Sequence, residues 1–136
     1  MSNTILITGS SSGIGKATAK LFQEKDWNVI ATMRTPEKEE ELTKLDNVFV
    51  TRLDVQDTQS IQEALRAGIE KFGKIDVLLN NAGYGAYGVL ESATTERIRR
   101  QFDVNVLGLL EVTKAVLPHF RQNKSGTVVN ISSIGG

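Results

Sequence analysis

Residues 4–15 read Thr-Ile-Leu-Ile-Thr-Gly-Ser-Ser-Ser-Gly-Ile-Gly. The first five are apolar or β-branched, which predicts a short strand, and the glycine- and serine-rich residues after them predict a loop. From Ile14 to Lys25 the apolar side chains fall near one face at helical spacing, which predicts an amphipathic helix. A strand, a loop and a helix in this order begin a βαβ unit.

The rest of the chain repeats this alternation. We expect further strands at residues 28–33, 48–53, 75–79 and 126–131, a helix over 61–72 ended by Gly73, and a longer helix over about 95–123 that Pro118 should bend or break. The charged stretch 37–45 predicts a solvated helix with Leu42 and Leu45 turned inward. Apolar strands alternating with helices predict an open α/β sheet of parallel strands covered on both faces.

Length and composition narrow the class of protein. A chain of 136 residues allows one domain, residues 1–136. Its 16 Lys and Arg balance 16 Asp and Glu, so it lacks the basic surplus typical of nucleic-acid and membrane-surface binders. There is no cysteine and one histidine, His119, so we expect no metal site. With neither a signal peptide nor a long apolar run expected, the sequence predicts a soluble cytoplasmic domain without nucleic-acid or membrane partners.

The first loop has the character of a phosphate-binding turn. A diphosphate requires backbone N–H groups close by and the positive end of a helix directed at it. Glycines permit that approach because a Cβ would stand in the way. The loop lies at the first strand-to-helix turn, where such sheets bind dinucleotides. The alternative is a flexible turn in which a serine caps the helix.

The end of the second expected strand discriminates between the two nicotinamide cofactors. An acidic residue there would bind the adenosine ribose hydroxyls and repel a 2′-phosphate. The sequence has Met33-Arg34 instead, and an arginine suits a phosphate because its guanidinium is a charged, forked donor. We therefore predict that NADP(H) is preferred over NAD(H). The alternative for Arg34 is an exposed loop residue.

Five motifs together resemble those of the short-chain dehydrogenase/reductase family, in the family's order and at its spacings. They are Thr8-Gly-Ser-Ser-Ser-Gly-Ile-Gly15, Leu53-Asp-Val55, Asn80-Asn-Ala-Gly83, Asp103-Val-Asn-Val106 and Val129-Asn-Ile-Ser-Ser133. The resemblance implies a Rossmann-type, doubly wound parallel sheet, truncated after about five strands in the order 3-2-1-4-5.

The resemblance also implies which residues contact the cofactor. The first loop would hold the diphosphate, Asp54 would contact the adenine with Val55 beside it, and Asn81 to Gly83 would line the other side. With Arg34, the candidate cofactor-binding residues are Gly9, Ser11, Ser12, Gly13, Ile14, Gly15, Arg34, Asp54, Val55, Asn81, Ala82 and Gly83. Alternatives are a helix cap for Asp54 and an Asn-Gly turn for the last group.

The activity that the resemblance implies is hydride transfer between a nicotinamide and a small-molecule carbonyl or alcohol. Ser133 matches the serine that donates to the substrate oxygen, and Asn105 matches the helix asparagine that holds a relay water. A turn serine and a locally bonded asparagine are the alternatives. The family's Tyr-x-x-x-Lys motif is missing, since Gly88 follows Tyr84 and Glu91 follows Tyr87 at that spacing. We expect both tyrosines to line the substrate space.

The missing motif keeps two interpretations open. The first is an NADP(H)-dependent oxidoreductase represented by its amino-terminal part, for which the end at Gly136 favours a truncated sequence. The second is a catalytically incomplete dinucleotide-binding module acting as a sensor or interaction domain. The resemblance implies a homo-oligomer for the full-length protein. In the isolated chain we expect the fifth strand to be an exposed edge and residues such as Phe102, Leu109 and Leu110 to be uncovered.

Overall fold

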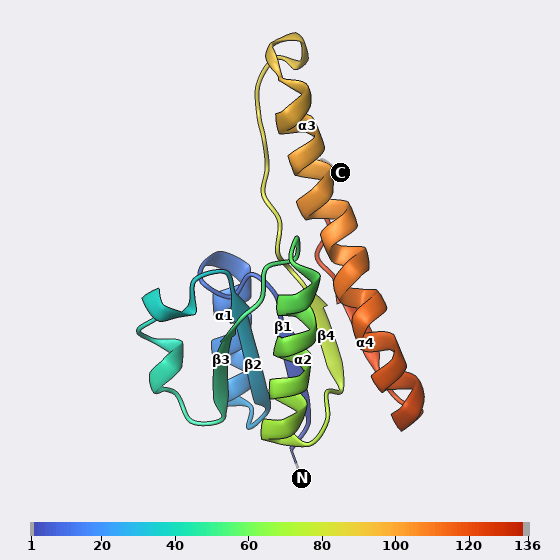
Figure 1. The fold of residues 1–136 in the computed structure, drawn as a ribbon. Helices are drawn as coiled ribbons and strands as arrows, with labels where there is room; N and C mark the ends of the chain where they lie inside the picture. The colour runs from blue at the N-terminus through green and yellow to red at the C-terminus, as the bar shows by residue number, and fades with distance from the viewer. Residues whose placement is uncertain (1, 135–136) are drawn as a thin grey trace.

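The computed structural model describes residues 2–134 and contains one parallel sheet of five strands (Figure 1). The strand order is β3-β2-β1-β4-β5, which confirms the predicted order. The strands are β1 (Thr4–Ile7), β2 (Asn28–Met33), β3 (Val48–Arg52), β4 (Val77–Asn80) and β5 (Thr127–Asn130). Every pairing is parallel, so the carboxyl ends of all five strands lie at one edge of the sheet.

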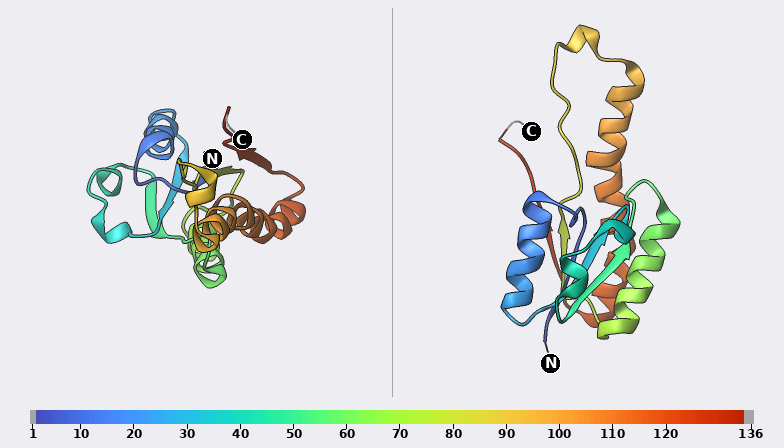
Figure 2. Two further views of the ribbon diagram at one scale, coloured as in Figure 1. Left: turned by 90° about the horizontal axis from the view of Figure 1, so that it is seen from above. Right: turned by 90° about the vertical axis from the view of Figure 1, so that its left-hand side faces the viewer.

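Helices cover both faces of the sheet (Figure 2). The helix α1 (Gly13–Glu24) packs on one face, and α2 (Thr58–Phe72) and α4 (Leu109–Asn123) pack on the other. Alternate residues of β1 serve the two faces, because successive strand side chains point in opposite directions. Ile5 and Ile7 belong to the core under α1, whereas Leu6 belongs to the core under α2 and α4. The expected two-sided α/β architecture is therefore confirmed.

The expected helix over residues 37–45 is wrong. Two short 3₁₀ turns, η1 (Pro36–Lys38) and η2 (Leu42–Lys44), occupy this stretch. Side-chain bonds to the backbone compete with helix formation here, since a Glu39 carboxylate oxygen accepts from the N–H groups of Glu41 and Leu42. Leu42 is buried as predicted and Leu45 is half-buried. The stretch is also less solvated than predicted, because the Glu39 side chain is only 3% exposed.

The long helical region is interrupted at a different place from the one expected. It comprises α3 (Thr95–Phe102), a π-helical segment η4 (Asp103–Gly108) and α4, which continues through Pro118 without a break. Proline removes one backbone hydrogen bond from a helix. Val116 and Phe120, on either side of it, are buried against the sheet and hold α4 in place.

His119 connects the helix α4 to Ile75, two residues before β4 begins. Its Nε2 accepts a hydrogen bond from the N–H of Ile75 at 3.0 Å, so this nitrogen must be unprotonated. Burial lowers the pKa of His119 below its usual value; nearby Lys74 lowers it further, while Asp76 acts in the opposite direction. The folded protein therefore favours the neutral ring.

Acidification is expected to destabilise the fold through His119. In the unfolded chain this ring binds a proton near pH 6.5, whereas the folded chain binds it only at a lower pH. The free energy of unfolding is therefore highest above about pH 6.5. It decreases as the pH falls through the lower pKa of the folded state. Melting temperatures from about pH 8 to about pH 5 test this for the wild type and for His119→Gln. If the melting temperatures of the two proteins changed equally with pH, the assignment to His119 would be contradicted.

One edge and one end of the molecule are uncovered. The strand β5 is an edge strand as predicted, and its Val129 is 41% exposed. Phe102 and Leu110 are exposed as predicted, whereas Leu109 is half-buried. The segment after β4 and the helix α3 project beyond the sheet (Figure 1). No helix formed by residues 2–134 combines the length and apolar character that crossing a bilayer requires.

We expect the isolated chain to self-associate, because an unpaired strand edge beside exposed apolar side chains is a site for pairing between molecules. Light scattering over a range of protein concentrations is the measurement. Val129→Lys places a charge on the edge and is expected to reduce the association. A monomer at every concentration would show that the β5 edge and the exposed apolar side chains do not drive association.

Candidate functional site

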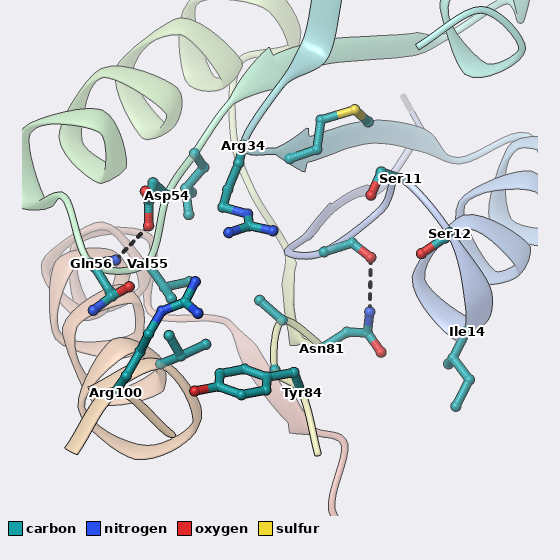
Figure 3. A pocket seen from close by; sticks show the side chains of 16 residues that line it. Ser11, Ser12, Ile14, Arg34, Asp54, Val55, Gln56, Asn81, Tyr84 and Arg100 are labelled. Atoms are coloured by element: carbon teal, nitrogen blue, oxygen red, sulfur yellow. Dashed lines mark hydrogen bonds between the residues drawn. The ribbon is translucent and has the colours of Figure 1, made fainter. Parts of the chain in front are cut away.

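A cleft of about 540 Å³ opens at the carboxyl ends of the strands (Figure 3). Residues following β1, β2, β3 and β4 line it together, because parallel strands bring these ends to one edge. Ten of the twelve candidate cofactor-binding residues are among them: Gly9, Ser11, Ser12, Ile14, Arg34, Asp54, Val55, Asn81, Ala82 and Gly83. Gly13 and Gly15 do not line the cleft directly.

The loop after β1 is held by the loop after β4. The Thr8 hydroxyl oxygen accepts from the N–H groups of Asn81 and Ala82, each at 2.9 Å. In return, Asn81 Nδ2 donates to the carbonyl oxygens of Thr8 at 3.2 Å and Gly9 at 3.0 Å. Thr8 itself is buried. Four hydrogen bonds thus fix the loop after β1 against the loop after β4, which differs from the flexible turn given as its alternative.

Two glycines allow this close packing. A Cβ on Gly15, in the first turn of α1, would lie 2.2 Å from the Gly9 carbonyl oxygen and 2.5 Å from Asn81 Nδ2. Gly9 has a φ of +66°, which favours glycine, and a Cβ there would lie 2.9 Å from the Cα of Ala82. Gly15 therefore shapes the site by letting α1 approach the loop.

The amino-terminal end of α1 has no side-chain cap. Ser12 occupies the N-cap position, but its side chain makes no capping hydrogen bond, and the first turn contains no acidic residue. The first-turn N–H groups thus lack a side-chain acceptor, and no carboxylate in that turn neutralises the helix dipole. The side chains of Ser11 and Ser12 border the cleft (Figure 3). This arrangement differs from the alternative, in which a serine caps the helix.

Two arginines direct positive charge at the cleft. Arg34 follows β2 and points into it (Figure 3), and it forms no hydrogen bond or ion pair with any residue of 2–134. The neighbouring Met33 is 3% exposed and packs in the core under α1, so it brings no charge to the cleft. Arg100, from α3, lies with its guanidinium carbon 5.5 Å from the centroid of the Tyr84 ring.

Asp54 borders the cleft after β3. Its Oδ1 accepts from the N–H of Gln56 at 2.9 Å. The helix cap proposed as its alternative role belongs to Asp57, whose Oδ1 accepts from the N–H groups of Gln59 and Ser60. Hydrogen bonding from the Ser60 N–H and the Arg52 side chain holds the pKa of Asp57 below its usual value, although partial desolvation opposes this. Asp54 is therefore not needed to begin α2.

The two candidate catalytic residues occupy different surroundings. Asn105, in η4, makes two hydrogen bonds to the backbone of Tyr84. Its Oδ1 accepts from the Tyr84 N–H at 3.0 Å, and its Nδ2 donates to the Tyr84 carbonyl at 2.7 Å. Its side chain is thus locally bonded in this structure. Ser133 is exposed beyond the end of β5, outside the lining of the cleft. Catalytic roles for both stay predictions.

A second hollow of about 600 Å³ adjoins the cleft and is formed by the segment after β4 and by α3. Tyr84 and Arg100 line both spaces, and Tyr87 lines the second one. Both tyrosines therefore border the hollow beside the cleft, and their role in lining a substrate space stays a prediction. Within residues 2–134, His, Asp and Glu side chains nowhere gather in the groups of three that a metal ion would need.

A family model described as short chain dehydrogenase matches residues 3–136. The chain belongs to this short-chain dehydrogenase family. It is 51% identical over 104 residues to an uncharacterised oxidoreductase of Schizosaccharomyces pombe, covering 76% of this chain and 44% of the relative. It is 42% identical over 132 residues to a 3-ketodihydrosphingosine reductase of Bacteroides thetaiotaomicron, covering 97% of this chain and 47% of the relative.

Solved structures superpose on this chain over nearly its whole length. ElxO with NADP bound superposes with a TM-score of 0.90 at 36% identity, covering 98% of this chain and 56% of ElxO. A short-chain dehydrogenase from Streptomyces avermitilis gives a TM-score of 0.91 at 36% identity, covering 99% and 51% of the two chains. The chain thus spans about half the length of these relatives.

The sequence did not identify two residues that line the cleft. Arg100 lines the cleft, but nothing local in its arginine-rich helix marks which arginine faces inward. Gln56 also borders the cleft beside Asp54 (Figure 3). Its position in the turn after β3, between the motif Leu53-Asp-Val55 and the cap Asp57, is the signal that could have identified it.

Proposed function

We propose that this chain is the dinucleotide-binding part of an NADP(H)-dependent oxidoreductase that interconverts a carbonyl and an alcohol by hydride transfer. One observation carries the proposal: the uncapped start of α1 and the unpaired Arg34 line the same cleft. The first suits a diphosphate and the second suits a phosphate on the adenosine ribose.

The residues present fit a nicotinamide dinucleotide. The cradle formed by Gly9 and Gly15 exists only without a Cβ at either position, and the cleft volume lies within the roughly 300–1,000 Å³ typical of small-molecule sites. Ser11, Ser12 and the first-turn N–H groups would hold the diphosphate, and Asp54 and Val55 would hold the adenosine. The cofactor, when bound, supplies or accepts the hydride. ElxO, a structural neighbour, was solved with NADP bound, which supports this choice.

Binding of the two reduced cofactors tests the proposal. Fluorescence titration of the 136-residue chain with NADPH and with NADH is expected to show binding of both and tighter binding of NADPH. The reason is a charge-assisted contact from Arg34, worth about 1.5–3 kcal/mol. Failure of both reduced cofactors to bind would contradict the proposed function.

A catalytically incomplete dinucleotide-binding module is the second candidate. It is favoured by the two tyrosines, neither of which has a lysine four residues later, and by the position of Ser133 outside the cleft. Removing a general acid or base typically costs about 10²–10⁴-fold in rate. Carbonyl-dependent oxidation of NADPH by this chain alone would exclude the module.

A further inference from the structure

A small hollow of about 300 Å³ lies beside the cofactor cleft at the end of β2. Ser11 and Met33 line both spaces, so the hollow and the cleft share a wall at the position where Arg34 follows the strand. The other lining residues are Lys16, Thr35, Lys38, Glu39, Glu40 and Glu41. Any phosphate held by Arg34 at this strand end lies close to these charges.

One of the two lysines that line this hollow, Lys16, belongs to α1. Its Nζ lies 3.3 Å from Glu39 Oε2 and 3.3 Å from Glu41 Oε1. Glu41 is 60% exposed and shares its charge with Lys20. Glu39 is the buried partner, so it screens Lys16 with the least competition from water.

Glu39 is fixed in its ionised form. Burial opposes ionisation, but the N–H groups of Leu42 and Glu41 and the amine of Lys16 outweigh it and hold the pKa of Glu39 below its usual value. The donor distances to Oε2 are 2.8 Å from Leu42 and 3.0 Å from Glu41. At neutral pH this carboxylate therefore keeps Lys16 paired, and the three glutamates of the hollow outnumber its two lysines.

From this arrangement we infer that Glu39 determines cofactor specificity by withholding Lys16 from the ribose 2′-phosphate. The inference rests on the proposed function, in which Arg34 contacts that phosphate. In the wild type Lys16 is held by Glu39, so the preference for NADP(H) is smaller than the positive charges near the site would allow. Glu39 is a positioning residue here, because it acts through Lys16.

Glu39→Gln is the decisive variant, since the amide keeps the size of the side chain and a carbonyl acceptor for the Leu42 N–H. It is expected to strengthen NADPH binding about 3- to 5-fold, the range of a partly exposed charge pair, and to leave NADH binding within about twofold. The gain is expected to decrease at moderate salt. Titration of the 136-residue chain at low and moderate ionic strength measures both constants.

Two controls distinguish loss of the Glu39–Lys16 ion pair from loss of any negative charge in the hollow. The double variant Glu39→Gln/Lys16→Gln removes both partners and is expected to return the NADPH-to-NADH ratio to the wild-type value. Glu40→Gln removes the same charge from the same hollow without touching an ion pair and is expected to change the ratio by less than Glu39→Gln does. If Glu39→Gln does not fold, Glu41→Gln, at an exposed partner of Lys16, is expected to shift the ratio in the same direction.

An unchanged ratio in the folded single variant, or a gain that persists without Lys16, overturns the inference while leaving the proposed function intact. Failure of the wild type to bind either cofactor overturns both. The two failures are therefore distinguishable in one set of titrations.

Discussion

Gly15→Ala is expected to weaken NADPH binding at least tenfold and to lower the melting temperature by about 5–10 °C, because forcing a side chain into a close-packed contact costs about 1–3 kcal/mol. The added Cβ would lie 2.2 Å from the Gly9 carbonyl oxygen, a backbone atom held by Asn81. Relief of the clash requires α1 to move away from the loop. That movement displaces the first-turn N–H groups from the position that suits a diphosphate.

Thermal unfolding by circular dichroism and NADPH titration measure the two effects. Gly13→Ala is the control for the clash: Gly13 has a positive φ of +56°, which Gly15 does not, but a Cβ there meets nothing within 4 Å. Its cost is confined to backbone strain, about 1–2 kcal/mol, and we expect a smaller decrease in melting temperature. A Gly15→Ala protein as stable as the wild type would show that α1 and the loop are not packed as described.

Arg34→Ala is expected to weaken NADPH binding by about ten- to a hundredfold and to leave NADH binding nearly unchanged, because only NADPH carries the 2′-phosphate. Arg34→Glu is expected to reverse the order of the two cofactors by repelling that phosphate. An acid at the neighbouring position 33 is a poor test, since Met33 is buried and a carboxylate there would disrupt the core.

The control for Arg34 is Arg66→Ala, which removes the same charge from the exposed face of α2, where Arg66 pairs with Glu70. It is expected to leave both dissociation constants unchanged. Measurements at low and moderate salt add a second check, since the Arg34 contribution should decrease as ionic strength rises. Equal affinities of the wild type for NADPH and NADH would make Arg34 an exposed loop residue, the alternative that the sequence left open.

The glycine-rich turn shows why so much of the site was predictable. Strand, loop and helix are each marked by short-range patterns, and parallel strands carry their carboxyl ends to one edge whatever the details of packing. Ten candidate residues from four strand ends consequently meet in one cleft. The motif resemblance supplied the strand order, which the alternation of elements alone does not determine.

Segments with weak or competing local signals were less predictable. Residues 37–45 have the charge pattern of a helix, yet the Glu39 carboxylate bonds to the backbone ahead of it and to Lys16 of α1. The π-helical segment η4 brings Gly108 against Val55, where a Cβ would lie 2.5 Å from a valine methyl. Neither contact is encoded in the spacing of nearby residues.

The sequence by itself determined the alternating α/β architecture, the glycine-rich turn between β1 and α1, the placement of Arg34 at the end of β2 and the family. Only the tertiary structure decided that Asp57 rather than Asp54 caps α2 and that Arg100 faces the cleft. It also decided that Asn105 hydrogen-bonds to the Tyr84 backbone and that Glu39 pairs with Lys16. The physical reason is the distance along the chain over which each interaction acts. Periodicity and turn chemistry act between neighbours in the chain, whereas these contacts depend on how separate elements pack.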